Sequence, residues 1–67
     1  MNLIAERLKL LRKEKNLTQT ELGEKVGIKR NTYSDWENRK TEPSLEKLIV
    51  LADFFEVSLD WLVGRDK

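Results

Sequence analysis

The clearest structural signals in this chain lie in residues 18–40, TQTELGEKVGIKRNTYSDWENRK. Thr18 and Glu21 have the spacing of a capping box, in which each side chain bonds a backbone amide that the first helical turn leaves unpaired. A helix is therefore predicted to begin at Thr18. Gly27 can adopt the left-handed conformation that ends a helix, and the apolar Ile28 follows it. The stretch thus predicts a helix, a tight turn and a second helix.

The second helix is predicted to open near Lys29 and to carry two different faces. At about 100° per residue, Tyr33, Trp36 and Glu37 fall on one side. The other side carries polar residues that can form several hydrogen bonds, namely Arg30, Asn31, Ser34, Asp35 and Asn38. One face is therefore suited to packing and the other to polar recognition.

Two short helices joined by a glycine turn form a helix-turn-helix, whose second helix can lie in the major groove of DNA. Arg30, Asn31 and Asp35 offer the side-chain chemistries that bond the edges of guanine, adenine and cytosine. The alternative is an ordinary solvated helix face, because polar residues face water by default. The capped turn beside this face favours the DNA interpretation.

The composition indicates one small domain that is stabilised by its apolar core alone. The chain has 67 residues and contains neither cysteine nor histidine, which excludes disulfides and argues against a structural zinc site. No apolar run approaches the roughly 20 residues that span a bilayer, and the N-terminal residues lack a secretory signal. We therefore expect a cytoplasmic, non-enzymatic protein with no cofactor, metal, membrane partner or small-molecule ligand.

The formal net charge is only +1, but charge is distributed unevenly along the chain. Residues 1–15 contain five basic and two acidic groups, and residues 16–28 contain one basic and two acidic groups. Residues 29–40 contain four basic and two acidic groups, and residues 41–67 contain three basic and six acidic groups. If the first three segments share a surface, a basic face that attracts phosphates opposes an acidic one. The alternative is chance unevenness in a chain with 37% charged residues.

The first helix is predicted from about Leu3 to Lys15, with Asn2 as its N-cap. Its apolar residues Ile4, Leu8 and Leu11 recur at the spacing of one buried stripe, whereas Leu10 is expected to be exposed and Leu3 to widen the core. Asn16 is expected to end this helix in the left-handed conformation.

Two further helices are predicted beyond the loop that Pro43 interrupts. Ser44 caps the first of them, whose broad apolar face suggests a central buried helix and comprises Leu45, Leu48, Ile49, Leu51, Ala52 and Phe55. Ser58 caps a short last helix that Gly64 ends, with Trp61 expected in the core and Phe54 at its rim. Five helices without a strand pattern predict a compact all-α domain.

The residues now assembled are similar to a known family. The segments LTQTELGEKVGI, KRNTYSDWENRKTEPSLEKL and LADFFEVSLDWLVG, in this order, resemble the lambdoid phage repressor and Cro-like DNA-binding domains of the xenobiotic-response-element type. The similarity covers Ile4 to Gly64. It implies a five-helix, lambda-repressor-like fold whose second and third helices form the helix-turn-helix.

The resemblance also implies roles for individual residues. Gln19 would bond a DNA phosphate from the first turn of its helix, and Arg12 and Glu37 would form an ion pair within the domain. Residues that would face base edges are Lys29, Arg30, Asn31 and Asp35, with Lys29 also able to bond a phosphate. Residues that would hold the DNA backbone are Thr32, Ser34, Asn38 and Lys40.

Three positions depart from the family pattern. Lys29 stands where a Ser or Thr cap is usual, so the recognition helix either starts less firmly or uses Asn31 as its cap. Arg39 and Glu56 stand where glycine commonly ends the third and fourth helices, which implies left-handed backbone strain. These departures put the ends of the recognition helix in question.

Residues 1–67 are expected to form a single domain, with a core of about residues 3–64 and a solvated tail at 65–67. The expected function is sequence-specific regulation of transcription by a homodimer on an inverted-repeat operator of double-stranded DNA. The dimer interface is expected to comprise Pro43 and the last helix, through Leu59, Leu62 and Val63. A protein-interaction module, such as an antitoxin or anti-repressor partner that uses the last helix, is the alternative. Whether transcription is repressed or activated stays open.

Overall fold

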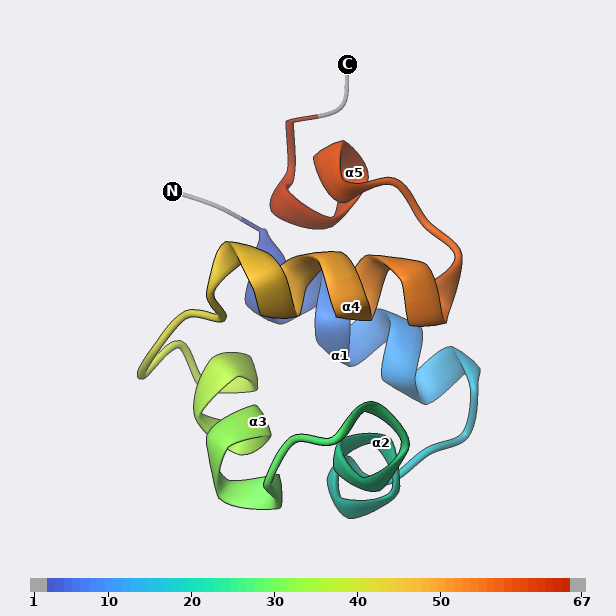
Figure 1. Cartoon of the computed structure of the whole chain (residues 1–67), viewed down its shortest axis with the longest axis vertical. Helices are drawn as coiled ribbons and strands as arrows, with labels where there is room; N and C mark the ends of the chain where they lie inside the picture. The colour runs from blue at the N-terminus through green and yellow to red at the C-terminus, as the bar shows by residue number, and fades with distance from the viewer. Residues whose placement is uncertain (1–2, 66–67) are drawn as a thin grey trace.

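The structure, a computed structural model, describes residues 3–65, which fold into five α-helices joined by short loops (Figure 1). In chain order these helices are α1 (Ile4–Glu14), α2 (Gln19–Val26), α3 (Arg30–Glu37), α4 (Leu45–Phe55) and α5 (Leu59–Val63). No strand occurs between residues 3 and 65, and the all-α, five-helix prediction is confirmed.

The predicted side-chain caps begin three of the helices. Thr18 accepts a hydrogen bond from the backbone N–H of Glu21, Ser44 from that of Lys47, and Ser58 from that of Trp61. The predicted cap at Asn2 lies outside the described residues, as do residues 66 and 67 of the expected tail. Local sequence therefore sets where α2, α4 and α5 begin.

All five helices end in the same way, with one residue in the left-handed conformation. These residues are Asn16, Gly27, Arg39, Glu56 and Gly64, with φ between 58° and 82°. The next residue then donates its N–H to the carbonyl five positions back, in bonds of Leu17 to Arg12, Ile28 to Gly23, Lys40 to Asp35, Val57 to Ala52 and Arg65 to Asp60. This is the Schellman pattern, which satisfies carbonyls that the helix leaves unpaired.

The left-handed conformation has an energetic cost where the residue has a side chain. Asn16 tolerates it, but Arg39 and Glu56 adopt φ of 63° and 58° at positions where glycine would be unstrained. Each costs roughly 1–2 kcal/mol relative to a right-handed residue. The strain expected from the sequence at these two positions is therefore present.

Each helix contributes one large side chain that is completely shielded from solvent. These side chains are Leu8, Leu22, Tyr33, Leu51 and Leu62. The surrounding core is completed mainly by other apolar residues of α1, α3 and α4, among them Ile4, Leu11, Trp36, Leu48 and Phe55. Burial of the large apolar side chains stabilises each helix by roughly 1.5–3 kcal/mol per side chain.

α4 is less buried than its sequence predicted. Leu48, Leu51, Ala52 and Phe55 face the core, but Leu45 is 63% exposed and Ile49 is 45% exposed. The apolar face of α4 is wider than its packed stripe, because the other helices cover only one side of it. The prediction of a central buried helix was therefore wrong for Leu45 and Ile49.

The predicted stripe of α1 is confirmed. Ile4, Leu8 and Leu11 are buried, whereas Leu10 is 49% exposed and Leu3 is half-buried. Both Phe54 and Trp61 are half-buried against the core, so Trp61 is not enclosed as predicted. Instead, the guanidinium of Arg7 stacks 4.4 Å from the centre of the Trp61 ring and donates to the Trp61 carbonyl.

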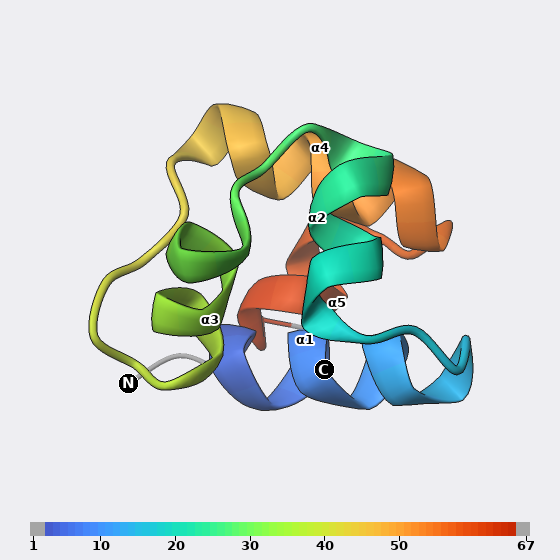
Figure 2. The same cartoon turned by 90° about the horizontal axis from the view of Figure 1, so that it is seen from below.

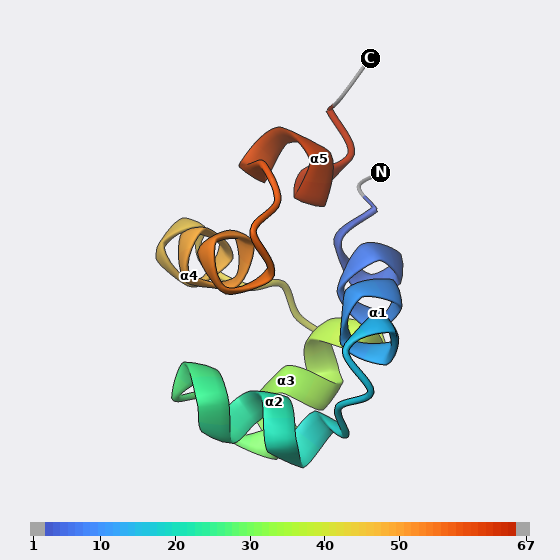
Figure 3. The same cartoon turned by 90° about the vertical axis from the view of Figure 1, so that its right-hand side faces the viewer.

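The helix-turn-helix occupies one end of the molecule. α2 and α3 lie together at that end, and α5 lies at the opposite end beyond α4 (Figures 1 and 3). Viewed from below, α2 and α3 are the helices nearest the reader, and the turn between them is unobstructed (Figure 2). α3 contacts both α1 and α2, so its position is fixed from two sides.

Candidate nucleic-acid interface

α2 starts from a complete capping box. The N–H of Glu21 donates to Thr18 Oγ1 at 3.0 Å, and the N–H of Thr18 donates to Glu21 Oε1 at 2.8 Å. Two of the four unpaired amides at this helix start are therefore satisfied. The next residue, Gln19, occupies the first helical position with its side chain half-buried. The predicted start at Thr18 is confirmed.

The turn between α2 and α3 depends on two glycines that act in different ways. Gly27 adopts the left-handed conformation, with φ 74° and ψ 34°. Gly23 lies inside α2, and a Cβ atom placed on it would lie 2.3 Å from the carbonyl oxygen of Ile28. The turn can therefore close only if residue 23 has no side chain. In the sequence, Gly23 is a lone glycine within a helical pattern. Such a glycine is commonly required by close packing.

The inner side of α3 anchors the helix in the domain. Tyr33 and Trp36 are buried, with their rings edge to face at a centroid distance of 6.0 Å. The Tyr33 hydroxyl donates a long hydrogen bond, 3.5 Å, to the carbonyl oxygen of Leu8 in α1. Burial raises the pKa of Tyr33, so the phenol stays protonated at neutral pH. Aromatic packing thus fixes the rotation of α3 about its axis.

The start of α3 presents three exposed polar side chains. Lys29, Arg30 and Asn31 are all exposed, and within residues 3–65 no side-chain hydrogen bond or ion pair engages them. Lys29 is the N-cap residue and provides no side-chain cap, and Asn31 lies inside the helix. The alternative that Asn31 caps α3 is therefore wrong. These groups remain available to an external partner.

The remaining predicted DNA contacts lie farther along α3 and in the loop that follows it. Thr32, Asn38 and Lys40 are exposed, while Ser34 and Asp35 are half-buried. Asn38 Nδ2 donates to Ser34 Oγ at 3.3 Å, so two predicted phosphate contacts already touch each other. The backbone N–H of Lys40 donates to the Asp35 carbonyl at 2.9 Å, which fixes the loop after α3.

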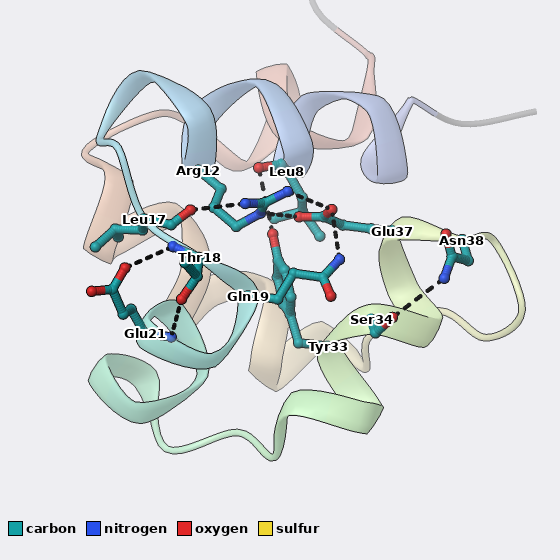
Figure 4. Close-up of polar contacts among 10 residues, drawn as sticks. All are labelled: Leu8, Arg12, Leu17, Thr18, Gln19, Glu21, Tyr33, Ser34, Glu37 and Asn38. Carbon is teal, nitrogen blue, oxygen red and sulfur yellow. Dashed lines mark hydrogen bonds and ion pairs between the residues drawn. The ribbon is translucent and has the colours of Figure 1, made fainter.

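Arg12 and Glu37 meet beneath this surface, as the resemblance implied (Figure 4). Arg12 Nε donates to Glu37 Oε2 at 2.8 Å, and Nη2 donates to Oε1 at 3.2 Å. Arg12 Nη1 also donates to the carbonyl of Leu17 at 2.8 Å. The Glu37 side chain is 2% exposed, so this bidentate pair is largely shielded from water.

The same carboxylate binds a third helix. Gln19 Nε2 donates to Glu37 Oε1 at 3.1 Å, so the residue expected to bond a phosphate is already held by Glu37. Burial by itself raises the pKa of the Glu37 carboxyl, but the hydrogen bonds and positive charge of Arg12, together with the hydrogen bond from Gln19, outweigh it and hold that pKa below its usual value. No sequence pattern indicated this contact between residues 18 positions apart.

The end of α3 is tied to α1 by a second ion pair. Arg39, the left-handed residue after α3, pairs through Nη2 with Glu6 Oε1 in α1. Both side chains are about half exposed or more, so the pair contributes at most about 1 kcal/mol. It nevertheless places the loop that carries Lys40.

The structure contradicts part of the predicted dimer interface. Leu62 is completely buried and Pro43 is also buried, so neither is available on the surface. Leu59 and Val63 are half-buried and pack against the core. In a helix as short as the five-residue α5, the spacing of apolar residues does not show which side faces the core. The exposed apolar side chains of the described chain are instead Leu10, Leu45, Ile49 and Val50.

Two other expectations concern absences. Within the described residues, no group of three or more His, Cys, Asp and Glu side chains is arranged to hold a metal ion. None of the helices between residues 3 and 65 has the length and apolar character to cross a membrane.

Comparison with known proteins identifies what this arrangement is similar to. Residues 8–62 match the family model described as Helix-turn-helix. The HTH-type transcriptional regulator AnsR of Bacillus subtilis is 43% identical over 67 residues, which is 100% of this chain and 56% of AnsR. The chain spans about half the length of the curated relatives it matches.

Two solved structures match the fold closely. A transcriptional regulator from Listeria innocua has a TM-score of 0.90 and 34% identity, over 100% of this chain and 63% of that one. The P22 c2 repressor in complex with a synthetic operator has a TM-score of 0.87 and 35% identity, over 98% of this chain and 100% of that one.

Proposed function

This chain belongs to the Helix-turn-helix family, and from that membership we propose that it is a sequence-specific regulator of transcription that binds double-stranded DNA. α3 is the recognition helix and enters the major groove, with α2 lying across the DNA backbone. When it is bound at a promoter in this way, the protein either excludes polymerase or recruits it. A reporter gene placed behind the bound site distinguishes these two outcomes.

One observation carries the proposal. The inner side of α3 is locked by Tyr33 and Trp36, while Lys29, Arg30 and Asn31 at its start are exposed and unpaired within residues 3–65. An unpaired, rigidly mounted set of donors is suited to reading base edges at little entropic cost. The likeness to a repressor that was solved on its operator supports this use of the surface.

The predicted contacts divide into two groups in this proposal. Lys29, Arg30, Asn31 and Asp35 read bases, although Asp35 is half-buried and reaches less far than the others. The residues that hold phosphates and set the register are Gln19, Thr32, Ser34, Asn38 and Lys40. Arg12 and Glu37 do not touch DNA and instead hold α1 against α3.

We further propose that two copies bind an inverted-repeat operator. Two-fold symmetry would set the two α3 helices about 34 Å apart, one turn of DNA. The buried Pro43 and Leu62 take no part, and the contact is made by exposed apolar side chains of α4, among them Leu45 and Ile49. Sedimentation with and without operator measures this directly. A monomer in both conditions would remove the dimer from the proposal.

Selection of bound duplexes from a random library is the experiment that tests the function. The expected product is a palindromic sequence with half-sites one helical turn apart, bound more weakly as salt rises because phosphate contacts release counterions. Recovery of no common sequence would overturn the proposal. Salt-insensitive binding to a protein would favour the interaction module instead. That alternative is less well supported, because α5 buries Leu62 in the core of the domain.

A further inference from the structure

The carboxylate of Glu37 is the point where three helices are joined through side chains (Figure 4). Glu37 lies in α3 and accepts hydrogen bonds from Nε and Nη2 of Arg12 in α1. It also accepts a hydrogen bond from the side-chain amide of Gln19, in the first turn of α2. Arg12 is fixed in turn by its bond to the carbonyl of Leu17. Each member of the network therefore has its orientation set by another.

This arrangement determines which way the Gln19 amide points. A carboxylate only accepts hydrogen bonds, so the group that faces Glu37 must be the amide nitrogen of Gln19 and not its oxygen. One N–H of Nε2 is used at 3.1 Å, and the second N–H is left over. Since the Gln19 side chain is half-buried, the second N–H can point in only a few directions.

We propose that Glu37 is a positioning residue for DNA binding, which holds the Gln19 amide so that its second N–H is aimed at a backbone phosphate. This inference rests on the proposed function. Glu37 itself touches no DNA in this account and acts through Gln19. Its place at the junction explains why a carboxylate can lie close to a surface that attracts phosphates, because Arg12 neutralises its charge.

The benefit of this arrangement is entropic. A glutamine side chain that rotates freely in the unbound protein loses its rotamer freedom when it bonds a phosphate. A Gln19 side chain already held by Glu37 has lost that freedom on folding. The start of α2 adds the positive end of a helix dipole at the same place, so a correctly aimed amide and the dipole act on one phosphate.

A double-mutant cycle measures whether Glu37 acts through Gln19. Operator affinity is compared for wild type, Gln19→Met, Glu37→Gln and the double variant, at a temperature where melting curves show each one folded. Glu37→Gln is expected to weaken binding roughly tenfold when Gln19 is present, as for a lost hydrogen bond to a charged group. In the Gln19→Met background the same change should cost less than about threefold.

The controls separate positioning from general loss of structure. Thr20→Ala changes an exposed neighbour in α2 and is expected to leave affinity unchanged. Because Gln19 is uncharged, Gln19→Met should lower affinity without changing the dependence of log affinity on log salt concentration. An equal effect of Glu37→Gln with and without Gln19 would overturn the inference, since the ion pair would then serve the fold alone.

A second measurement uses the unaltered protein and remains decisive if Glu37→Gln does not fold. Relaxation of the Gln19 side-chain amide in the free protein should give an order parameter near the rigid backbone value of about 0.85. A value below about 0.6 would mean that the amide rotates freely, and would overturn the positioning role. This result does not depend on DNA, so it separates failure of the inference from failure of the proposed function.

Discussion

The two ends of α3 make opposite use of polar side chains. At its last turn, Glu37 is almost completely shielded, and Arg12 and Gln19 satisfy its oxygens. At its first turn, Arg30 and Asn31 are exposed and bond no other side chain between residues 3 and 65. One helix thus has a polar end that stabilises the domain and a polar end that remains available for binding.

In a small domain, buried and exposed polar groups serve stability and recognition differently. Each buried polar group must be paired within the domain, because an unpaired one costs its full desolvation. An exposed group is solvated by water and can exchange that water for a partner at little cost. Substitutions at the last turn of α3 should therefore affect folding and, through Gln19, DNA affinity, whereas those at its first turn should affect binding alone.

Loss of the ion-pair partner of Glu37, at the last turn of α3, should destabilise the fold most. Arg12→Ala leaves the Glu37 carboxylate shielded and without its main partner, and should cost about 3–5 kcal/mol of unfolding free energy. Lys13→Ala removes an exposed cation one position along the same helix and should cost no more than about 0.5 kcal/mol. Thermal melting of both variants checks this. Equal melting temperatures would mean that the ion pair does not support the fold.

The turn that joins the two helices should also be sensitive, but differently at its two glycines. Gly23→Ala places a Cβ against the Ile28 carbonyl and should cost about 3 kcal/mol. Gly27→Ala meets no atom within 4 Å and costs only the left-handed strain of about 1–2 kcal/mol. Urea titration of the two variants compares them. A greater loss for Gly27→Ala would contradict the close approach at Gly23.

Substitution of exposed residues at the first turn of α3, or in the loop after α3, should alter DNA recognition without altering the fold. Arg30→Ala should cost about 1–3 kcal/mol at one base pair of each half-site, whereas Lys40→Ala should weaken all sequences alike and reduce the salt slope by about one. Binding measured across single-base variants of the selected operator, at several salt concentrations, distinguishes the two. The assignment of bases to Arg30 fails if both variants weaken all operators equally.

The contribution of Glu37 to the stability of the fold should show a smaller dependence on pH. The folded pKa of Glu37 is lowered, so its contribution to stability is fully present above the unfolded value of about 4.3 and is lost as pH falls through the lower folded value. The stability difference between wild type and Glu37→Gln should therefore shrink in acid. Urea titrations at pH 7 and at successively lower pH measure it, and a constant difference would contradict the cause given for the lowered pKa.

The sequence predicted the fold well because most of its signals are local. Thr18 with Glu21, Ser44, Ser58 and Gly27 each act within one helical turn, so their caps and stops could be read from spacing. The strained left-handed Arg39 and Glu56 were anticipated differently, because the resembled family commonly carries glycine at their positions. Local hydrogen bonding needs no knowledge of the rest of the molecule.

The errors occurred where tertiary packing decides the outcome. Leu45 and Leu62 are both apolar residues in helices, yet one is 63% exposed and the other completely buried, because only neighbouring helices determine which side is covered. The bond from Gln19 to Glu37 likewise depends on how α2 meets α3. Arg12 and Glu37 were paired by resemblance, since spacing alone does not connect residues 25 positions apart.

Measurement of both stability and base preference on Asn31→Ala is the sharpest test that the first turn of α3 serves recognition and not folding. We predict that discrimination against single-base changes falls by about 1–3 kcal/mol at one position of each half-site. The unfolding free energy should stay within about 0.5 kcal/mol of wild type, because Asn31 is exposed. A variant that loses stability but keeps the wild-type pattern of base preference would contradict the account.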